Sequence, residues 1–130
     1  MNSPQIFLAA KRYAVAGAST DRQKYGNKVF RALKESGRDV APLNPKADQV
    51  EGITAFTAIS DLPTLPESLS VVTPPIVSRQ LTELAIELGV LNIWFQPGAE
   101  DAEASRLARS AGLNVIDDGS CLLVLLALEK

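Results

Sequence analysis

The chain has 130 residues, a net charge of −2 and no histidine. This length fits one domain of common size, which buries enough surface to fold without a disulfide or a structural metal. The negative net charge argues against a nucleic-acid surface spread over the whole molecule. The absence of histidine excludes Ser-His-Asp and Cys-His catalysis as well as histidine-ligated metal sites. The single cysteine, Cys121, has no partner for an internal disulfide and belongs to no zinc-binding cluster.

Two apolar runs, at residues 6–10 and 122–128, are too short to cross a membrane. No basic segment precedes the first run, so it is a poor signal peptide. We therefore expect a cytoplasmic protein that binds neither a membrane nor a nucleic acid.

The first half of the chain alternates between strand and helix patterns. Residues 12–16 predict a strand, and residues 27–36 predict a helix that ends at Gly37. A second strand is expected at 40–43. An irregular stretch follows at 44–66, with one short strand at 53–56.

The alternation continues in the second half. Strands are predicted at 69–73, 92–95 and 114–116. Helices are predicted between and after them, from Pro74-Pro75 to Leu88, at 101–111 and at 121–128. The pattern is typical of one Rossmann-like, doubly wound α/β domain over residues 1–130, with a five-stranded, mainly parallel sheet.

Ligands of open parallel sheets bind beyond the carboxyl ends of the strands, and the loops expected there have a distinctive composition. The first is Gly17-Ala18-Ser19-Thr20. Its glycine and small residues would let backbone N–H groups approach a phosphate near a helix N-terminus. The alternative is a tight turn without a ligand.

The second loop is Asn44-Pro45-Lys46. NAD sites usually carry an acidic residue after the second strand, whereas a lysine suits an additional ribose phosphate, as in coenzyme A or NADP. The alternative is a solvated lysine in a turn.

The remaining two loops are rich in proline. Thr73-Pro74-Pro75-Ile76-Val77 offers a stiff apolar wall for an adenine ring, or simply a rigid helix start. Gln96-Pro97-Gly98 could present polar groups to a ligand, or serve as an ordinary turn.

Basic residues are expected to gather on the same rim and so to favour an anionic ligand. They are Arg22, Lys24, Lys28, Lys46 and Arg79.

Five segments, in this order, resemble the CoA-binding domain family, small proteins similar to the CoA-binding domain of the succinyl-CoA synthetase alpha subunit. They are AVAGAS (14–19), KYGN (24–27), LNPK (43–46), VTPP (72–75) and IWFQPG (93–98). The resemblance covers roughly residues 12–121 and implies that the chain binds coenzyme A or an acyl-CoA. It places the first loop around the phosphates, Asn-Pro-Lys near the adenosine phosphates and Thr-Pro-Pro beside the adenine.

The loops and the resemblance together predict one set of cofactor-binding residues. These are Gly17, Ala18, Ser19, Thr20, Lys24, Tyr25, Asn44, Pro45, Lys46, Thr73, Pro74, Pro75, Val77, Gln96, Pro97 and Gly98.

Relatives carry an Asp-Arg-Cys-like element after the fifth strand, whereas residues 117–121 here read DDGSC, without arginine. The family makes Cys121 a candidate for a mixed disulfide with the CoA thiol, and a buried structural cysteine is the alternative. Succinyl-CoA synthetase passes a phosphoryl group through a histidine in a further domain, which this chain lacks. We therefore expect no catalytic or metal-ligating residues and a CoA-binding or CoA-sensing module.

Three other functions stay open. The first is an NAD(P)-binding redox sensor or oxidoreductase fragment. The second is an enzyme acting on a small CoA thioester through Tyr25, Asp117, Asp118 or Cys121. The third is an interaction module with a vestigial nucleotide pocket. The nearly unbroken apolar run at 122–128 predicts a buried terminal helix that could leave one face for a homodimer partner.

Overall fold

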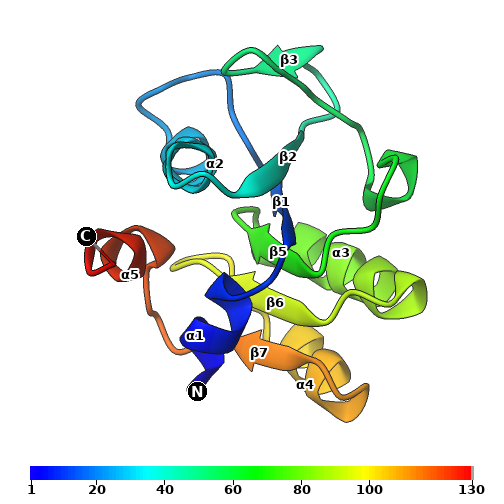
Figure 1. The fold of residues 1–130 in the computed structure, drawn as a ribbon. Helices are drawn as coiled ribbons and strands as arrows, with labels where there is room; N and C mark the ends of the chain where they lie inside the picture. The colour runs from blue at the N-terminus through cyan, green and yellow to red at the C-terminus, as the bar shows by residue number, and fades with distance from the viewer. Residues whose placement is uncertain (130) are drawn as a thin grey trace.

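The computed structural model describes residues 1–129, and its centre is a sheet of five parallel strands (Figure 1). Neighbouring strands are parallel throughout this sheet. The predicted α/β class and five-stranded sheet are therefore confirmed. In sheet order the strands are β2 (Asp39–Leu43), β1 (Arg12–Ala16), β5 (Ser68–Val71), β6 (Asn92–Phe95) and β7 (Asn114–Ile116).

Helices cover both faces of the sheet, as expected of a doubly wound fold (Figure 1). Successive strand residues point to opposite faces, so Val15 and Trp94 belong to one core while Val71 and Phe95 belong to the other. The first core is covered by α1 (Ser3–Leu8), α2 (Tyr25–Glu35) and α5 (Leu122–Ala127), and the second by α3 (Pro75–Leu88) and α4 (Ala102–Ser110).

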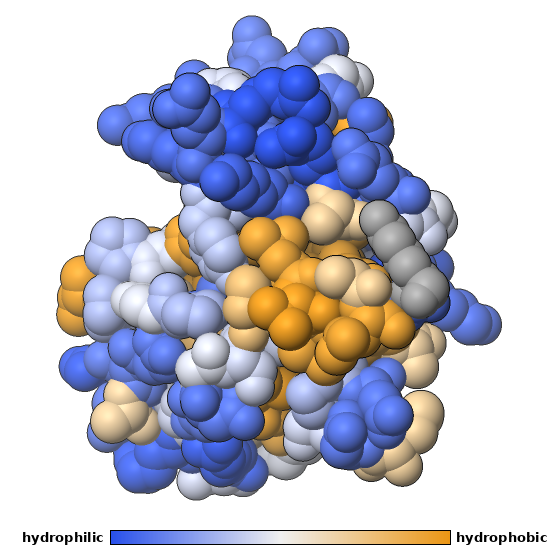
Figure 2. Space-filling view, turned by 90° about the vertical axis from the view of Figure 1, so that its left-hand side faces the viewer, coloured by the Kyte–Doolittle hydropathy of each residue, from blue (hydrophilic) through white to orange (hydrophobic). Residues whose placement is uncertain are grey.

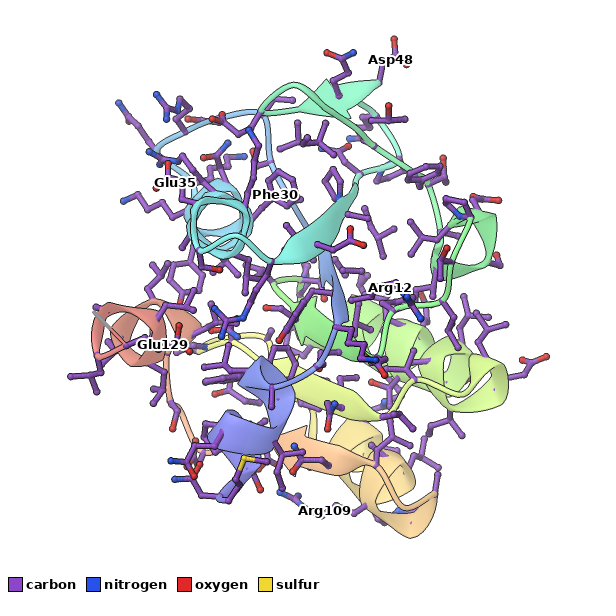
Figure 3. The ribbon with its side chains drawn as sticks, in the orientation of Figure 1. Arg12, Phe30, Glu35, Asp48, Arg109 and Glu129 are labelled. Atoms are coloured by element: carbon purple, nitrogen blue, oxygen red, sulfur yellow. The ribbon has the colours of Figure 1, made fainter. Side chains whose placement is uncertain are left out.

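Helix α2 shows how the sequence pattern produces this packing. Val29, Phe30 and Leu33 recur at helical spacing, and all three are fully buried. Phe30 projects from α2 toward the sheet (Figure 3). The helix begins at Tyr25, two residues before the prediction, and Gly37 follows its end with a left-handed φ of 87°.

Helix α1 was not predicted, because six residues are too few to show a clear period. Asn2 caps it by accepting from the backbone of Gln5. The Ser68 hydroxyl donates to the Phe7 carbonyl at 2.9 Å, and the Phe7 ring meets Trp94 edge-on with centroids 5.2 Å apart. Tertiary contacts therefore hold α1 against the first core.

The stretch between β2 and β5 is more ordered than predicted. In place of one strand at 53–56 there is a hairpin of β3 (Gln49–Val50) and β4 (Ile53–Thr54), followed by the 3₁₀ turn η1 (Ile59–Asp61). An isolated parallel bridge pairs Phe56 with Leu43, so the chain lies beside β2, the edge strand of the sheet, at this point.

Helix α5 is buried on one side only, although its sequence is apolar all round. Leu122 and Leu126 are buried, whereas Val124 is 56% and Leu128 74% exposed. Figure 2 shows the resulting apolar patch, which lies below a hydrophilic part of the surface. In residues 1–129, no helix is long and apolar enough to span a bilayer.

Candidate functional site

The strand order reverses between β1 and β5, so the loops that follow these strands lie side by side at the carboxyl edge. The backbone N–H of Val72 donates to the Ala16 carbonyl at 2.9 Å. Gly17 has a left-handed φ of 86°, and a Cβ there would fall 1.9 Å from the Val72 carbonyl oxygen. A Cβ on Gly26 would lie 2.0 Å from the Gly17 carbonyl oxygen. Gly17 and Gly26 are therefore needed, because a side chain at either position would prevent the backbone at residues 17, 26 and 72 from approaching so closely.

Side-chain amides bind two consecutive carbonyls of the first loop. Asn44 Nδ2 donates to the Ala18 carbonyl at 2.9 Å, and Asn27 Nδ2 donates to the Ser19 carbonyl at 2.8 Å. In a trans peptide the N–H of the next residue points in the direction opposite to the carbonyl. Within residues 1–129, the N–H groups of Ser19 and Thr20 have no protein acceptor. They are available to an anion near the start of α2.

A first hollow of about 480 Å³ opens beside this loop. The second predicted loop closes its other side, where Asn44 Oδ1 accepts from the backbone N–H of Lys46 at 2.8 Å and so fixes the turn. Lys24 and Lys46 are both exposed at its rim. The lining residues are Gly17, Ala18, Ser19, Lys24, Tyr25, Gly26, Leu43, Asn44, Pro45, Lys46 and Val72.

A second hollow, of about 300 Å³, shares Tyr25 and Val72 with the first. The two hollows are therefore adjacent at the carboxyl edge, and we call them together the edge groove. The lining of the second hollow includes no charged side chain. Its residues are Tyr25, Val72, Thr73, Pro74, Pro97, Gly98 and Ala99.

All but four of the predicted site residues line the edge groove. Thr20, Pro75 and Val77 lie outside both hollows. Gln96 is also outside, because it is fully buried. The predicted set did not include four lining residues, Gly26, Leu43, Val72 and Ala99. The first three lie within the segments that carry the family resemblance, whereas Ala99 only follows the Gln96-Pro97-Gly98 loop.

The polar atoms of Gln96 are all used within the fold. Its Nε2 donates to Ser70 Oγ at 3.2 Å, while its Oε1 accepts from the Leu122 backbone N–H at 3.0 Å and from the Tyr25 hydroxyl at 3.3 Å. The Tyr25 hydroxyl also contacts Cys121 Sγ. Burial, followed by this contact, raises the pKa of Tyr25 well above its usual value. Tyr25 therefore stays a neutral phenol that joins the groove wall to the start of α5.

The basic rim is smaller than predicted. Arg79 Nε lies 2.9 Å from an oxygen of Asp101, and this ion pair joins α3 to the N-cap of α4. Arg22 Nε lies 3.4 Å from Glu51. Lys24 and Lys46 are the two cations among the lining residues.

The other candidate reactive groups do not assemble. Both Asp117 oxygens accept from Arg109, at 2.7 and 2.9 Å, and this pairing lowers the pKa of Asp117. Within the described part of the chain, no three His, Cys, Asp or Glu side chains are placed to hold a metal ion.

Comparison with known proteins identifies relatives of two sizes. The chain is 29% identical over 129 residues to an uncharacterized protein, YneT, of Bacillus subtilis, covering 97% of this chain and 93% of YneT. It is 32% identical over 121 residues to the alpha subunit of an ADP-forming acetate–CoA ligase II of Pyrococcus furiosus. That match covers 85% of this chain but 26% of the subunit.

Solved structures give the same result. A conserved hypothetical protein of Pyrococcus furiosus superposes with a TM-score of 0.82 at 36% identity, covering 88% of this chain and 98% of that one. The model of a family described as the CoA binding domain matches residues 11–127. With the switch-point groove and its loops in the expected order, this match shows that the chain belongs to the CoA binding domain family.

Proposed function

We propose that this chain binds coenzyme A, free or as an acyl-CoA, in the edge groove. The observation that carries the proposal is the capture of the Ala18 and Ser19 carbonyls by two asparagine amides. It leaves consecutive backbone N–H groups available to a phosphate beside two exposed lysines, Lys24 and Lys46. Membership of the CoA binding domain family supports the same ligand.

The residues present fit such a ligand at both ends. The first loop and Lys24 would hold phosphates, and Lys46 would meet the additional phosphate on the ribose. The uncharged lining of the second hollow suits the uncharged parts of the cofactor, with Thr73 and Pro74 on one side and Pro97 and Gly98 on the other.

We further propose that the chain acts as a binding or sensing module without catalysing a reaction by itself. The chain corresponds to about a quarter of the ligase subunit that it resembles, 26% by length, so ligase activity is not carried over. Tyr25 and Cys121, two of the candidate reactive groups, contact each other, and a raised pKa keeps the Tyr25 phenol protonated.

Calorimetric titration in reducing buffer tests the proposal, with CoA, acetyl-CoA, NAD, NADP and ADP as separate ligands. We expect CoA or acetyl-CoA to bind selectively. Lys46→Ala should weaken that binding up to about fivefold, since an exposed lysine paired with a phosphate contributes up to about 1 kcal/mol. ADP, which lacks the additional ribose phosphate, should respond much less to the substitution.

Lys11→Ala is the matched control, because it removes an exposed lysine before β1, at the opposite edge of the sheet. It should leave the affinity for CoA unchanged. Binding of NADP without CoA would move the chain to the redox class. Binding of none of the five ligands would favour an interaction module with a vestigial pocket.

A further inference from the structure

Glu51 occupies a backbone conformation that its residue type rarely adopts. It has a φ of 50° and is the one non-glycine residue of the described chain with positive φ. With Gly52, at φ 78°, it forms the two-residue turn between β3 and β4. Asn-Gly or Gly-Gly is the usual choice for such a turn. The side chain of Glu51 therefore needs an explanation outside the turn itself.

That side chain points back to α2 and the first loop rather than to solvent. It is 19% exposed. Its Oε2 accepts from Asn27 Nδ2 at 3.1 Å and lies 3.4 Å from Arg22 Nε. The Glu51 carbonyl accepts from Lys34 Nζ at 3.1 Å, which ties the turn to the far end of α2.

Asn27 receives these contacts as a fully buried residue with a fixed amide orientation. Arg31 Nε, which can only donate, lies 3.1 Å from Asn27 Oδ1. The Glu51 carboxylate, which can only accept, meets Nδ2 on the other side. Together the two charged partners select the orientation in which Nδ2 faces the Ser19 carbonyl, 2.8 Å away.

We propose that Glu51 is a positioning residue of the edge groove. Through Asn27 it holds the Ser19 carbonyl away from the ligand and so keeps the N–H of Thr20 available to an anionic phosphate. This inference rests on the proposed function, which it deepens. It assigns to the β3–β4 hairpin, which lines neither hollow, a part in the recognition of phosphate.

The Glu51 carboxylate could act through its charge or through its position, and the two roles predict opposite changes in the affinity for an anion when it is removed. If the carboxylate acted only through its charge, its loss would strengthen the binding of an anion. If it positions Asn27, its loss removes one of the two charged partners that fix the amide, so the amide becomes more mobile and the same binding weakens. The sign of the change in affinity therefore separates the two roles.

Two substitutions separate position from charge. Glu51→Gly removes the carboxylate and relieves the positive φ, so the variant should fold as well as the wild type. Its affinity for CoA should fall about tenfold, the effect of losing roughly one charge-assisted hydrogen bond. Glu51→Gln removes only the charge, keeps an oxygen that can accept from Asn27, and should bind within about twofold of the wild type or more tightly.

Asp48→Ala is the control on the same hairpin, since Asp48 is exposed and points away from α2 (Figure 3). Its affinity for CoA should match the wild type. Exchange of the Asn27 side-chain amide protons, measured by NMR without ligand, provides a readout that needs no cofactor. They should be protected in the wild type and in Glu51→Gln, and exchange at least tenfold faster in Glu51→Gly.

The proposal is overturned if Glu51→Gly binds CoA as tightly as the wild type, or more tightly, while the Asn27 protons stay protected. If the wild type does not bind CoA, the proposed function fails instead. Inorganic pyrophosphate then serves as the probe for the same variants. A shift of the Thr20 amide signal with the wild type but not with Glu51→Gly would support the positioning role, and equal responses would reject it.

Discussion

Gly17 is the residue on which the shape of the edge groove depends most directly. In Gly17→Ala the new Cβ would overlap the Val72 carbonyl, 1.9 Å away, at a φ of 86°. We expect a loss of about 1 to 2 kcal/mol from the left-handed conformation and a further 1 to 3 kcal/mol from overpacking. Urea unfolding measures the total, and calorimetry with CoA should show binding lost as the two loops separate.

Gly112→Ala is the matched control for this substitution. Gly112 has the same φ of 86°, but a Cβ there meets nothing within 4 Å. It should cost only the conformational part, about 1 to 2 kcal/mol, and leave binding of CoA unchanged. Equal losses in the two variants would show that the contact with Val72 contributes nothing.

At the residue scale the sequence predicts which loops form the groove but not how each side chain is used. The small residues at 17–19 and the Asn-Pro-Lys turn were predicted from their composition to belong to the site, and they line the groove. Gln96 shows the limit of such reasoning. It follows β6 in the predicted loop, yet Ser70, Leu122 and Tyr25 take up its polar atoms. Those partners lie in β5, α5 and α2, which are distant from Gln96 in the sequence. The residues next to Gln96 therefore do not predict these contacts.

Arg38 joins elements from both ends of the chain. Its guanidinium donates to the Leu8 carbonyl at the end of α1, to the Tyr13 hydroxyl, and to both Glu129 oxygens at 2.7 and 3.1 Å. Its side chain is 18% exposed. We expect Arg38→Ala to lower the free energy of unfolding by about 2 to 3 kcal/mol, because several charge-assisted bonds are lost at once. Chemical denaturation gives the value.

Hydrogen exchange locates the effect of Arg38→Ala. Amides of α1 and α5 should exchange faster in the variant, while those of α3 and α4 should change little. Arg38→Lys should recover only part of the loss, since an ammonium cannot form the paired contacts of the guanidinium. Arg106→Ala, which removes an exposed pair with Glu103, should cost less than about 1 kcal/mol. An equal loss in both arginine variants would contradict the role given to Arg38.

At the element scale, the predictions succeeded where the sequence carries a clear apolar period or apolar run. The strands of the sheet and the helices α2, α3 and α4 lie within a few residues of their predicted positions, since each carries a clear apolar period or run. The hairpin of β3 and β4 has two residues per strand, which are too few to show an alternation of apolar and polar residues. Helix α1 depends on Ser68 and Asn114, which lie far from it in sequence.

At the scale of the whole molecule, the doubly wound sheet follows from the order of elements and the handedness of parallel connections. The apolar run at 122–128 predicted a terminal helix but not which of its residues would be covered. The homodimer expected from that run stays a prediction, although Val124 and Leu128 leave an apolar patch on the surface (Figure 2). Light scattering at micromolar concentration tests it, and a monomer would reject it.

The stability of the whole molecule should depend on pH at both extremes but not between them. Ion pairing with Arg79 and Arg109 lowers the pKa of Asp101 and Asp117 respectively. A lowered pKa contributes stability above the unfolded value, about 3.9, and that contribution is lost as the pH falls through the folded pKa. Burial raises the pKa of Tyr13 and Tyr25, so stability should fall as the pH rises above about 10.

Between about pH 5 and 8 the urea midpoint should be flat, because the chain has no histidine to titrate there. Asp117→Asn tests the acid limb, since it should be less stable than the wild type at pH 7 and the difference should shrink as the pH falls below about 3.9, the unfolded value. A parallel offset at every pH would show that the Arg109 pair does not govern acid unfolding. A slope through pH 6 to 7 would contradict the assignment of acid sensitivity to the paired carboxylates, whose pKa values lie below this range.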